Sequence, residues 1–530
     1  MVFALAAAQC GAIPTPQVVT PAAEKVATTE TVTPVDEKAL IEEATPTEEI
    51  TPTNKAEAQV PVSTASVMAP LLMSDAEITN FDNLLNDAKG IGVNAISVDV
   101  WWGLVENNGN QNFDWSYYDK VFQKIRDKGL KIVPIMSFHK CGGGPGDSCN
   151  ISLPTWIWSH FTNAGLSSHD LKYESETGKV QDDAIAPWVI ENPTVLAQFS
   201  EFMDEFEQHF APIAGDFIEI NISLGPTGEL RYPAYNSSDG WQYPDRGNFQ
   251  AYSDFAQSNF RNWVLAEYGG LSGVSNRWDI PLGNPNEIRV PGGQLPDNSG
   301  RRAQSFVDNN DYKDMQYGKD FIDWYNESLV GHGKRLLLAA HNAFDGAMRS
   351  IPLGMKIPGL HWQMQCTEHP RIAEITAGLI QTSLNYNARH PAAFGYKNIM
   401  DMIADVKIST NREIILHFTA LEMDNDANCG VGTSLAEALV FWISQAAEDR
   451  GITHRGENAL GCVNDPEDPT SADNRSWDRI RNVFTYALYS GFTFLRLTNA
   501  SGEFGCIPWN SVDKERYREF IKDYVSTNFK

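Results

Sequence analysis

The sequence Ser66-Val-Met-Ala-Pro-Leu-Leu72 is followed, after one residue, by Ser74-Asp-Ala-Glu77. The first segment is an apolar run of the length typical of a buried β-strand. The second has the spacing of a capping box, in which a serine and a glutamate three positions later satisfy backbone groups at the start of a helix. A second apolar run, Asn94-Ala-Ile-Ser-Val-Asp-Val100, follows the expected helix. This order predicts a strand, a helix and the next parallel strand.

The same alternation continues along the rest of the chain and predicts eight strands separated by helices. The expected strands cover residues 66–72, 94–100, 131–137, 216–222, 356–361, 413–419, 453–457 and 492–497. This number favours an α/β fold of the closed (β/α)8 TIM barrel type over a doubly wound sheet. No glycine-rich nucleotide fingerprint follows the first strand, which also disfavours the doubly wound alternative.

Two of the expected connections, residues 139–192 and 224–355, are very long. In a barrel, the loops that follow the strands gather at the carboxyl end, so we expect these two connections to form a lobe over an active site.

A helix is also expected over residues 435–447, opening with the capping box Ser434-Leu-Ala-Glu437, and another follows Asn510.

The composition of the 530 residues is that of a globular protein, with 42% hydrophobic and 11% aromatic residues. The 41 Lys and Arg residues are outnumbered by 68 Asp and Glu residues, which gives a formal net charge of −27. Such a charge repels nucleic acid phosphates and anionic membrane surfaces, so neither is an expected partner. No apolar run approaches the roughly 20 residues of a membrane span. The 7 cysteines are too few for a disulfide scaffold and too scattered for a zinc module.

The first 65 residues differ in composition from the rest of the chain. Residues 1–10 form a short apolar, signal-like segment that lacks a basic start, which indicates weakly that the protein is secreted rather than cytoplasmic. Residues 11–65 contain seven Pro, nine acidic residues and no aromatic residue, which predicts a disordered acidic linker rich in Thr and Pro. The linker is either a stalk or a segment without function. Residues 66–530 are the expected catalytic domain.

Polar side chains occur where seven of the eight predicted strands end. They are Asp99, Glu106, His139, Asp147, Glu229, His361, Thr419, Glu422, Glu457 and Arg496. A single carboxylate in such a position is usually a solvated charge or a helix cap, but the repetition favours a shared site. Carboxylates can accept sugar hydroxyls and perform acid and base steps, and aromatic rings can stack on sugar faces. The pattern therefore predicts a carbohydrate site at the mouth of the barrel.

Four motifs in this region resemble those of one known family. They are Val98-Asp-Val-Trp-Trp-Gly103, Phe138-His-Lys-Cys-Gly-Gly143, Gly225-Pro-Thr-Gly-Glu-Leu-Arg-Tyr-Pro233 and Gly456-Glu-Asn-Ala-Leu460. In this order they resemble the β-amylases of glycoside hydrolase family 14, in particular the bacterial type, from about residue 66 to the C-terminus. The resemblance implies a (β/α)8 barrel that requires no cofactor. It also implies that the protein releases β-maltose, with inversion, from the non-reducing ends of α-1,4-glucans such as starch, glycogen and maltodextrins.

The resemblance also implies roles for individual residues. It makes Glu229 the general acid and Glu457 the general base. The implied substrate contacts are Asp99, His139, Asp147, Tyr235, Lys356, His361, Trp362, Thr419, Asn458, Ala459 and Arg496. Among these, Tyr235 and Trp362 are expected to form walls of the sugar subsites. Asp147 belongs to a segment similar to the family's mobile lid, and Thr419 to one similar to its inner loop.

The same resemblance implies two further features. Cys141 and Cys149 would form a disulfide, the alternative being two free thiols. Glu106 and Asn110 resemble part of a structural calcium site, but two oxygen ligands are far fewer than the 6–8 that calcium takes.

Two other functions remain open at this stage. A retaining barrel glycosidase would also carry two carboxylates at these strand ends, at a shorter separation. A non-catalytic glucan sensor could share the fold, although we would expect it to have lost the acid or the base.

Overall fold

The computed structural model describes residues 62–142, 149–292, 303–365, 367–381, 393–426, 433–459, 475–498 and 509–525. The signal-like segment 1–10 and the linker up to residue 61 lie outside these ranges. Residues 62–65, which the composition assigns to the linker, are described, and Val62 among them is buried.

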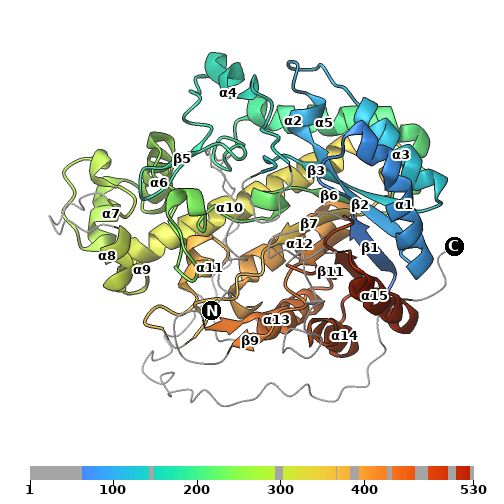
Figure 1. The fold of residues 1–530 in the computed structure, drawn as a ribbon. Coiled ribbons are helices and arrows are strands. Elements are labelled where there is room, and N and C mark those ends of the chain that lie inside the picture. Colours follow the sequence, from blue (N-terminus) through green and yellow to red (C-terminus); the bar gives the residue numbers. More distant parts are fainter. Residues whose placement is uncertain are drawn as a thin grey trace.

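A closed barrel of parallel strands forms the centre of the protein (Figure 1). Its strands are β1 (Thr64–Met68), β2 (Ala95–Trp101), β3 (Lys131–Ser137), β6 (Ile220–Ile222), β7 (Leu353–Ile357), β8 (Ile414–Phe418), β11 (Thr453–Glu457) and β12 (Gly491–Phe494). Around the barrel their order is β1-β12-β11-β8-β7-β6-β3-β2, and the neighbours pair in parallel. The prediction of a (β/α)8 barrel is therefore confirmed.

Helices cover the outside of the barrel (Figure 1). They are α1 (Asp75–Ile91), α3 (Ser116–Asp127), α5 (Pro193–Phe210), α10 (Gln316–Ala343), α12 (Lys397–Thr410), α13 (Ala436–Glu448), α14 (Ser476–Tyr486) and α15 (Ser511–Tyr524). Each buries one apolar face, as α1 does with Ile78, Phe81 and Leu85. Within the described ranges, no helix combines the length and the apolar character needed to cross a bilayer.

The starts of two helices test the capping boxes expected from the sequence. At α1 the box is confirmed, because Ser74 accepts from the Glu77 backbone N–H at 3.4 Å and the Glu77 carboxylate accepts from that of Ser74 at 2.7 Å. At α13 the expectation is wrong. The helix is capped by Leu435, without a side-chain hydrogen bond. Ser434 belongs instead to the short strand β10 (Ser434–Leu435), and its hydroxyl pairs with the ring of His361.

The strand bounds agree with the sequence pattern for β3 and β11 and differ most for β7. That strand was expected over residues 356–361 but covers Leu353–Ile357. Pro358 follows it directly and has no N–H with which to continue the ladder. In the same way, β1 ends at Met68, two residues before Pro70.

The two long connections pack against each other, as expected of a lobe. The connection after β3 includes α4 (Ile157–His160), β4 (Tyr173–Glu174) and β5 (Val180–Gln181). The connection after β6 includes α6 (Asp254–Glu267), α7 (Leu271–Trp278), α8 (Ala303–Asp308) and α9 (Asp311–Asp314). The backbone N–H of Tyr252 donates to the carbonyl of Glu174 at 3.0 Å, which joins them. Figure 1 shows β5 and α6 to α9 together at one side of the barrel.

The barrel interior holds polar side chains where one strand carries a glycine. Gly354 in β7 lies beside Asn221 in β6 and beside Glu219, the residue that precedes β6. A Cβ at Gly354 would lie 1.9 Å from Oδ1 of Asn221 and 2.1 Å from Oε1 of Glu219. Gly354 therefore makes the space that the polar side chains of the neighbouring strand occupy.

We predict that Gly354→Ala lowers the free energy of unfolding by about 1–3 kcal/mol, because the added methyl overpacks this interior. Gly90→Ala is the matched control. In α1, a Cβ at Gly90 meets nothing within 4 Å, so alanine should be neutral or stabilise by about 0.5–1 kcal/mol. Urea unfolding followed by circular dichroism measures both. Equal stability of Gly354→Ala and the wild type would contradict the packing described for Gly354.

Candidate active site

The carboxyl ends of β7 and β11 bring Lys356 and Glu457 together. Nζ of Lys356 lies 2.5 Å from Oε2 of Glu457, and only 4% of Glu457 is exposed. Burial would raise the pKa of Glu457, but the Lys356 ammonium, followed by the His417 ring, outweighs burial and lowers the pKa to about 2. Glu457 is therefore a carboxylate at neutral pH.

Glu229 lies beside the same lysine, at the end of the short 3-10 turn η4 (Pro226–Gly228). It forms a parallel β-bridge with Lys356. Its carboxylate accepts from Nε of Arg231 at 2.8 Å and from the hydroxyl of Thr227 at 3.2 Å. Both bonds are made to the oxygen Oε2. Arg231 is part of the motif quoted from the sequence, but the sequence did not single it out as the partner of Glu229.

The charge of Lys356 interacts with both glutamates. Burial would lower the pKa of Lys356, but Glu457 raises it. The carboxylates of Glu229 and Asp99 act in the same direction. Lys356 therefore stays an ammonium group, placed among carboxyl groups that come from β11, from β2 and from the turn after β6.

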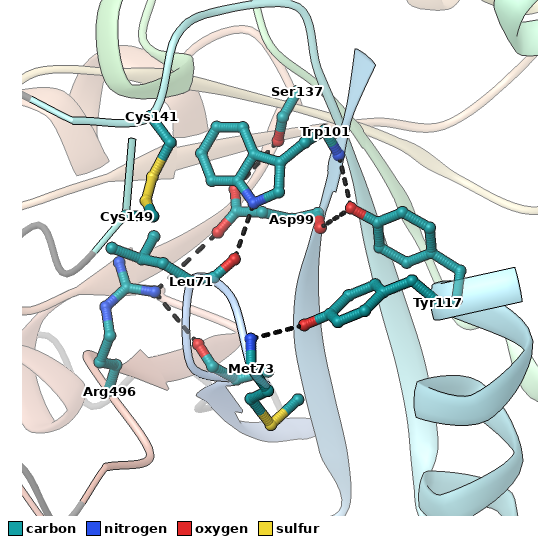
Figure 2. Close-up of a disulfide and its surroundings, with 11 residues drawn as sticks. Leu71, Met73, Asp99, Trp101, Tyr117, Ser137, Cys141, Cys149 and Arg496 are labelled. Atoms are coloured by element: carbon teal, nitrogen blue, oxygen red, sulfur yellow. Dashed lines mark hydrogen bonds and ion pairs between the residues drawn. A yellow bond between two sulfur atoms is a disulfide. The ribbon is translucent and has the colours of Figure 1, made fainter. Parts of the chain in front are cut away.

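Asp99 in β2 is held by two neighbours at the mouth of the barrel (Figure 2). The hydroxyl of Ser137 donates to Oδ1 at 3.0 Å, and Nη1 of Arg496 lies 3.9 Å from Oδ2. The same nitrogen of Arg496 donates to the carbonyl of Ala69 at 3.1 Å. Burial raises the pKa of Asp99, although Arg496 and Ser137 oppose this effect.

Cys141 and Cys149 lie near this group and are joined by a disulfide, with their Cα atoms 5.8 Å apart (Figure 2). Cys141 also forms an antiparallel bridge with Ile151. The disulfide that the resemblance implies is thus present in the structure, and it closes the intervening segment into a loop. Asp147 lies in this segment, outside the described residues, so its sugar contact stays a prediction.

His139 and His361 are buried and neutral. Burial, followed by the positive charge of Lys356, lowers the pKa of His139 to about 3, and burial lowers that of His361 to about 4. Each ring uses Nδ1 for a serine hydroxyl at 2.7 Å, Ser223 for His139 and Ser434 for His361. Nε2 of His361 is buried and has no hydrogen-bond partner among the residues that the structure describes. Neutral rings held in this way can exchange hydrogen bonds with hydroxyl groups.

Thr419 and Asn458 connect neighbouring strand ends. The hydroxyl of Thr419 accepts from the backbone N–H of Gly359 at 3.0 Å, which ties the loop after β8 to that after β7. The amide of Asn458 accepts from the backbone N–H of Leu495 at 2.8 Å. These hydrogen bonds give Thr419 and Asn458 a structural role. The sugar contacts expected of the two residues stay predictions.

The aromatic side chains predicted as sugar walls are largely covered by protein. Trp362 is 1% exposed, and its ring meets that of Tyr235 edge-on at 5.1 Å. Trp362 also donates to the carbonyl of Asp245 in the lobe at 3.0 Å. The Arg231 guanidinium lies over the ring of Tyr235 at 4.3 Å. The aromatic cluster therefore joins the lobe to the barrel, and sugar stacking on it remains a prediction.

The structure also shows contacts of polar residues to which the sequence assigned no individual role. Glu422 accepts from the backbone N–H of Ala459 at 2.9 Å and is buried. Arg455 lies two positions before Glu457 in β11, and His417 lies in the neighbouring strand β8. The period of two along a strand places Arg455 on the same face as Glu457, and this signal could have identified it.

Glu106 and Asn110 do not fit a calcium site. The Glu106 carboxylate is buried and accepts from the indole N–H of Trp102 at 2.7 Å and from the backbone N–H of Gln111 at 2.6 Å. Burial raises the pKa of Glu106 to about 7, which disfavours the charged form that a cation requires. Asn110 is exposed. Across the described ranges, no three His, Cys, Asp or Glu side chains come together as metal ligands.

Six of the predicted site residues thus converge at one end of the barrel. Direct contacts or charge interactions connect Asp99, His139, Glu229, Lys356, Glu457 and Arg496. A parallel barrel that gathers two glutamates, a lysine and neutral histidines at the carboxyl ends of its strands is the arrangement of a barrel glycoside hydrolase.

Comparison with known proteins gives the family. Residues 66–524 match glycosyl hydrolase family 14, so the chain belongs to this family. It is 36% identical over 435 residues to a β-amylase of Bacillus cereus, covering 82% of this chain and 70% of that protein. It is 35% identical over 444 residues to a thermophilic β-amylase of Thermoanaerobacterium thermosulfurigenes, covering 83% and 71%. The bacterial-type resemblance is therefore confirmed.

A solved structure agrees with this assignment. The catalytic domain of a β-amylase from Paenibacillus polymyxa superposes with a TM-score of 0.72 at 32% identity. The match covers 88% of this chain and 100% of that one. The fold and the sequence therefore point to the same relatives.

We predict that Lys356→Met lowers the free energy of unfolding at neutral pH by roughly 3–5 kcal/mol, because it leaves Glu457 as a buried charge without its ammonium partner. The pKa of Glu457 lies below its ordinary value of 4.5, at about 2. The pair of Lys356 and Glu457 therefore stabilises the fold fully at pH values above 4.5. That contribution to stability is lost as the pH falls through 2. The difference in the free energy of unfolding between Lys356→Met and the wild type should therefore become smaller as the pH falls from 4.5 to 2.

Urea unfolding at a series of pH values tests this prediction. Lys334→Met is the control, because the Lys334 ammonium pairs at 3.1 Å with Asp405 on the surface. That variant should lose at most about 1 kcal/mol. A stability loss for Lys356→Met that is small, or that does not change with pH, would contradict the interaction described for Lys356.

Proposed function

We propose that this protein is an exo-acting, inverting hydrolase that releases β-maltose from the non-reducing ends of α-1,4-glucans such as starch, glycogen and maltodextrins. The observation that carries the proposal is the buried Glu457 carboxylate, held ionised by Lys356 at 2.5 Å on the mouth of the barrel. A carboxylate in this state is unprotonated at neutral pH, which a general base must be before it takes a proton.

In the proposed mechanism, Glu229 protonates the glycosidic oxygen while Glu457 takes a proton from water. The water attacks the anomeric carbon from the opposite face of the ring, so the configuration inverts. Inversion requires the two carboxyl groups to lie roughly 6.5–9.5 Å apart, against about 5–5.5 Å for retention. Glu229 and Glu457 both lie next to Lys356, and the proposed mechanism requires that their carboxyl groups leave room for the attacking water.

We assign substrate contacts to the remaining polar groups of the mouth. The neutral rings of His139 and His361, the carboxylate of Asp99 and the guanidinium of Arg496 offer both donors and acceptors to sugar hydroxyls. Asp147 completes this set in the proposal.

We also propose that the protein acts outside the cytoplasm. The disulfide between Cys141 and Cys149 supports this, because such bonds persist in oxidising compartments and are rare in the cytosol.

The two glutamates should respond differently to the leaving group. We predict that Glu457→Gln lowers maltose release by roughly 10²- to 10⁴-fold on both maltopentaose and α-maltosyl fluoride, because water activation is needed for each. Glu229→Gln should show a similar loss on maltopentaose but a much smaller one on the fluoride, whose leaving group needs no proton.

Steady-state rates on the two substrates measure these effects. Glu413→Gln is the control, since Glu413 precedes β8 at the amino end of the barrel and pairs there with Lys407. It should keep the wild-type rate. Equal losses on both substrates for Glu229→Gln would remove it from the role of general acid, and an active Glu457→Gln would remove Glu457 from that of base.

A further inference from the structure

A buried group of charged side chains lies in the barrel interior, directly next to Glu457. It consists of Glu219, which precedes β6, His417 in β8 and Arg455 in β11. Nε2 of His417 lies 2.6 Å from Oε1 of Glu219, and Nη1 of Arg455 donates to the other oxygen of Glu219. Their exposed fractions are 0% for Glu219, 3% for His417 and 9% for Arg455, so water does not reach them freely.

The second ring nitrogen of His417 faces Glu457. Nδ1 of His417 lies 3.5 Å from Oε1 of Glu457, an ion-pair distance rather than a hydrogen bond. Lys356 binds the other oxygen, Oε2. The two carboxylate oxygens of Glu457 therefore face two different basic side chains, one in β7 and one in β8. This arrangement fixes the rotation of the carboxylate plane as well as its position.

The barrel backbone is adapted to hold this group. Lys356, His417 and Arg455 are register partners in the adjacent strands β7, β8 and β11. Glycines in β7 and β12 leave the space that the long side chains fill. A Cβ at Gly354 would lie 2.1 Å from Oε1 of Glu219, and one at Gly491 would lie 3.0 Å from Cδ of Arg455.

The two carboxylates that face the His417 ring favour its protonated form. Burial would lower the pKa of His417, but Glu219 and then Glu457 raise it above the ordinary value of 6.5. For other buried histidines burial wins, and the pKa of His454 for example falls to about 4. The charged groups that face His417 are the anions Glu219 and Glu457 and the cations Arg455 and Lys356.

We propose that His417, held by Glu219, is a positioning residue that orients the Glu457 carboxylate to take a proton from the attacking water. Glu219 acts by holding His417, and Arg455 donates to the second carboxylate oxygen of Glu219. This inference rests on the proposed function, because it assumes that Glu457 is the base. It adds a part of the machinery that does not touch the substrate and that the sequence motifs did not reveal.

His417→Gln and Glu219→Gln are the variants that test it. We expect His417→Gln to lower kcat by roughly 10- to 100-fold while KM stays near the wild-type value, as is typical for the loss of a residue that orients another. Activity requires ionised Glu457, and the variant lacks one cation beside it. The acid limb of kcat/KM should therefore move to higher pH. Glu219→Gln should act in the same direction, and the double variant should be no worse than the poorer single variant.

His454→Gln is the matched control. His454 is also buried in β11, but its Nε2 pairs at 2.8 Å with Ser444 in α13, away from Glu457. It should leave kcat and the acid limb unchanged. A folded His417→Gln with a wild-type kcat and pH profile would overturn the inference. If Glu457→Gln, assayed alongside, keeps its activity, the proposed function fails instead.

Wild-type protein provides a test that does not depend on folding of the variants. Neutron diffraction from crystals at neutral pH locates the protons on the His417 ring. We expect protons on both Nδ1 and Nε2. A ring with a proton on one nitrogen alone would overturn the inference, because a neutral ring could not serve as the second cation beside Glu457.

Discussion

The contact between the Lys356 ammonium and the Glu457 carboxylate is the interaction on which the site depends. Taking two charges out of water is expensive, and a buried pair persists only when its geometry is good and its remaining groups are satisfied. Here Nζ lies 2.5 Å from Oε2 of Glu457, and further carboxylates face the lysine. The result is a carboxylate that stays ionised, with a pKa of about 2, although only 4% of the residue is exposed.

The barrel makes this arrangement possible because parallel strands end at the same rim. Lys356 and Glu457 come from β7 and β11, which are separated in the barrel by β8 alone. The long connections then cover the rim, and their aromatic side chains pack on Trp362 after β7. Covering the rim lowers the local dielectric, which strengthens each interaction at the site. Burial and the charge of Lys356 lower the pKa of His139 and keep its ring neutral. Lys356 stays charged because the effect of Glu457 on its pKa outweighs that of burial.

The sequence predicted the features that depend on local pattern. The bounds of β3 and β11, the capping box of α1 and the polar strand ends, including Asp99 and Glu457, follow from periodicity and from the shared rim of parallel strands. The features it missed depend on residues far apart in the chain. Ser434 bonds His361, 73 positions away, instead of capping α13, and Glu219 bonds His417 across 198 positions. No local pattern encodes such contacts, although glycines such as Gly354 mark the space that they require.

The most direct test is the anomeric form of the first product. If Glu457 activates water on the face opposite the leaving group, the maltose released from maltopentaose must carry the β configuration. Proton NMR during the earliest turnovers, before mutarotation, distinguishes the two anomeric signals. We predict that the β-anomer appears first and that the α-anomer grows later at the rate of mutarotation. An α-anomer that appears first would contradict both inversion and the role of Glu457 as the base.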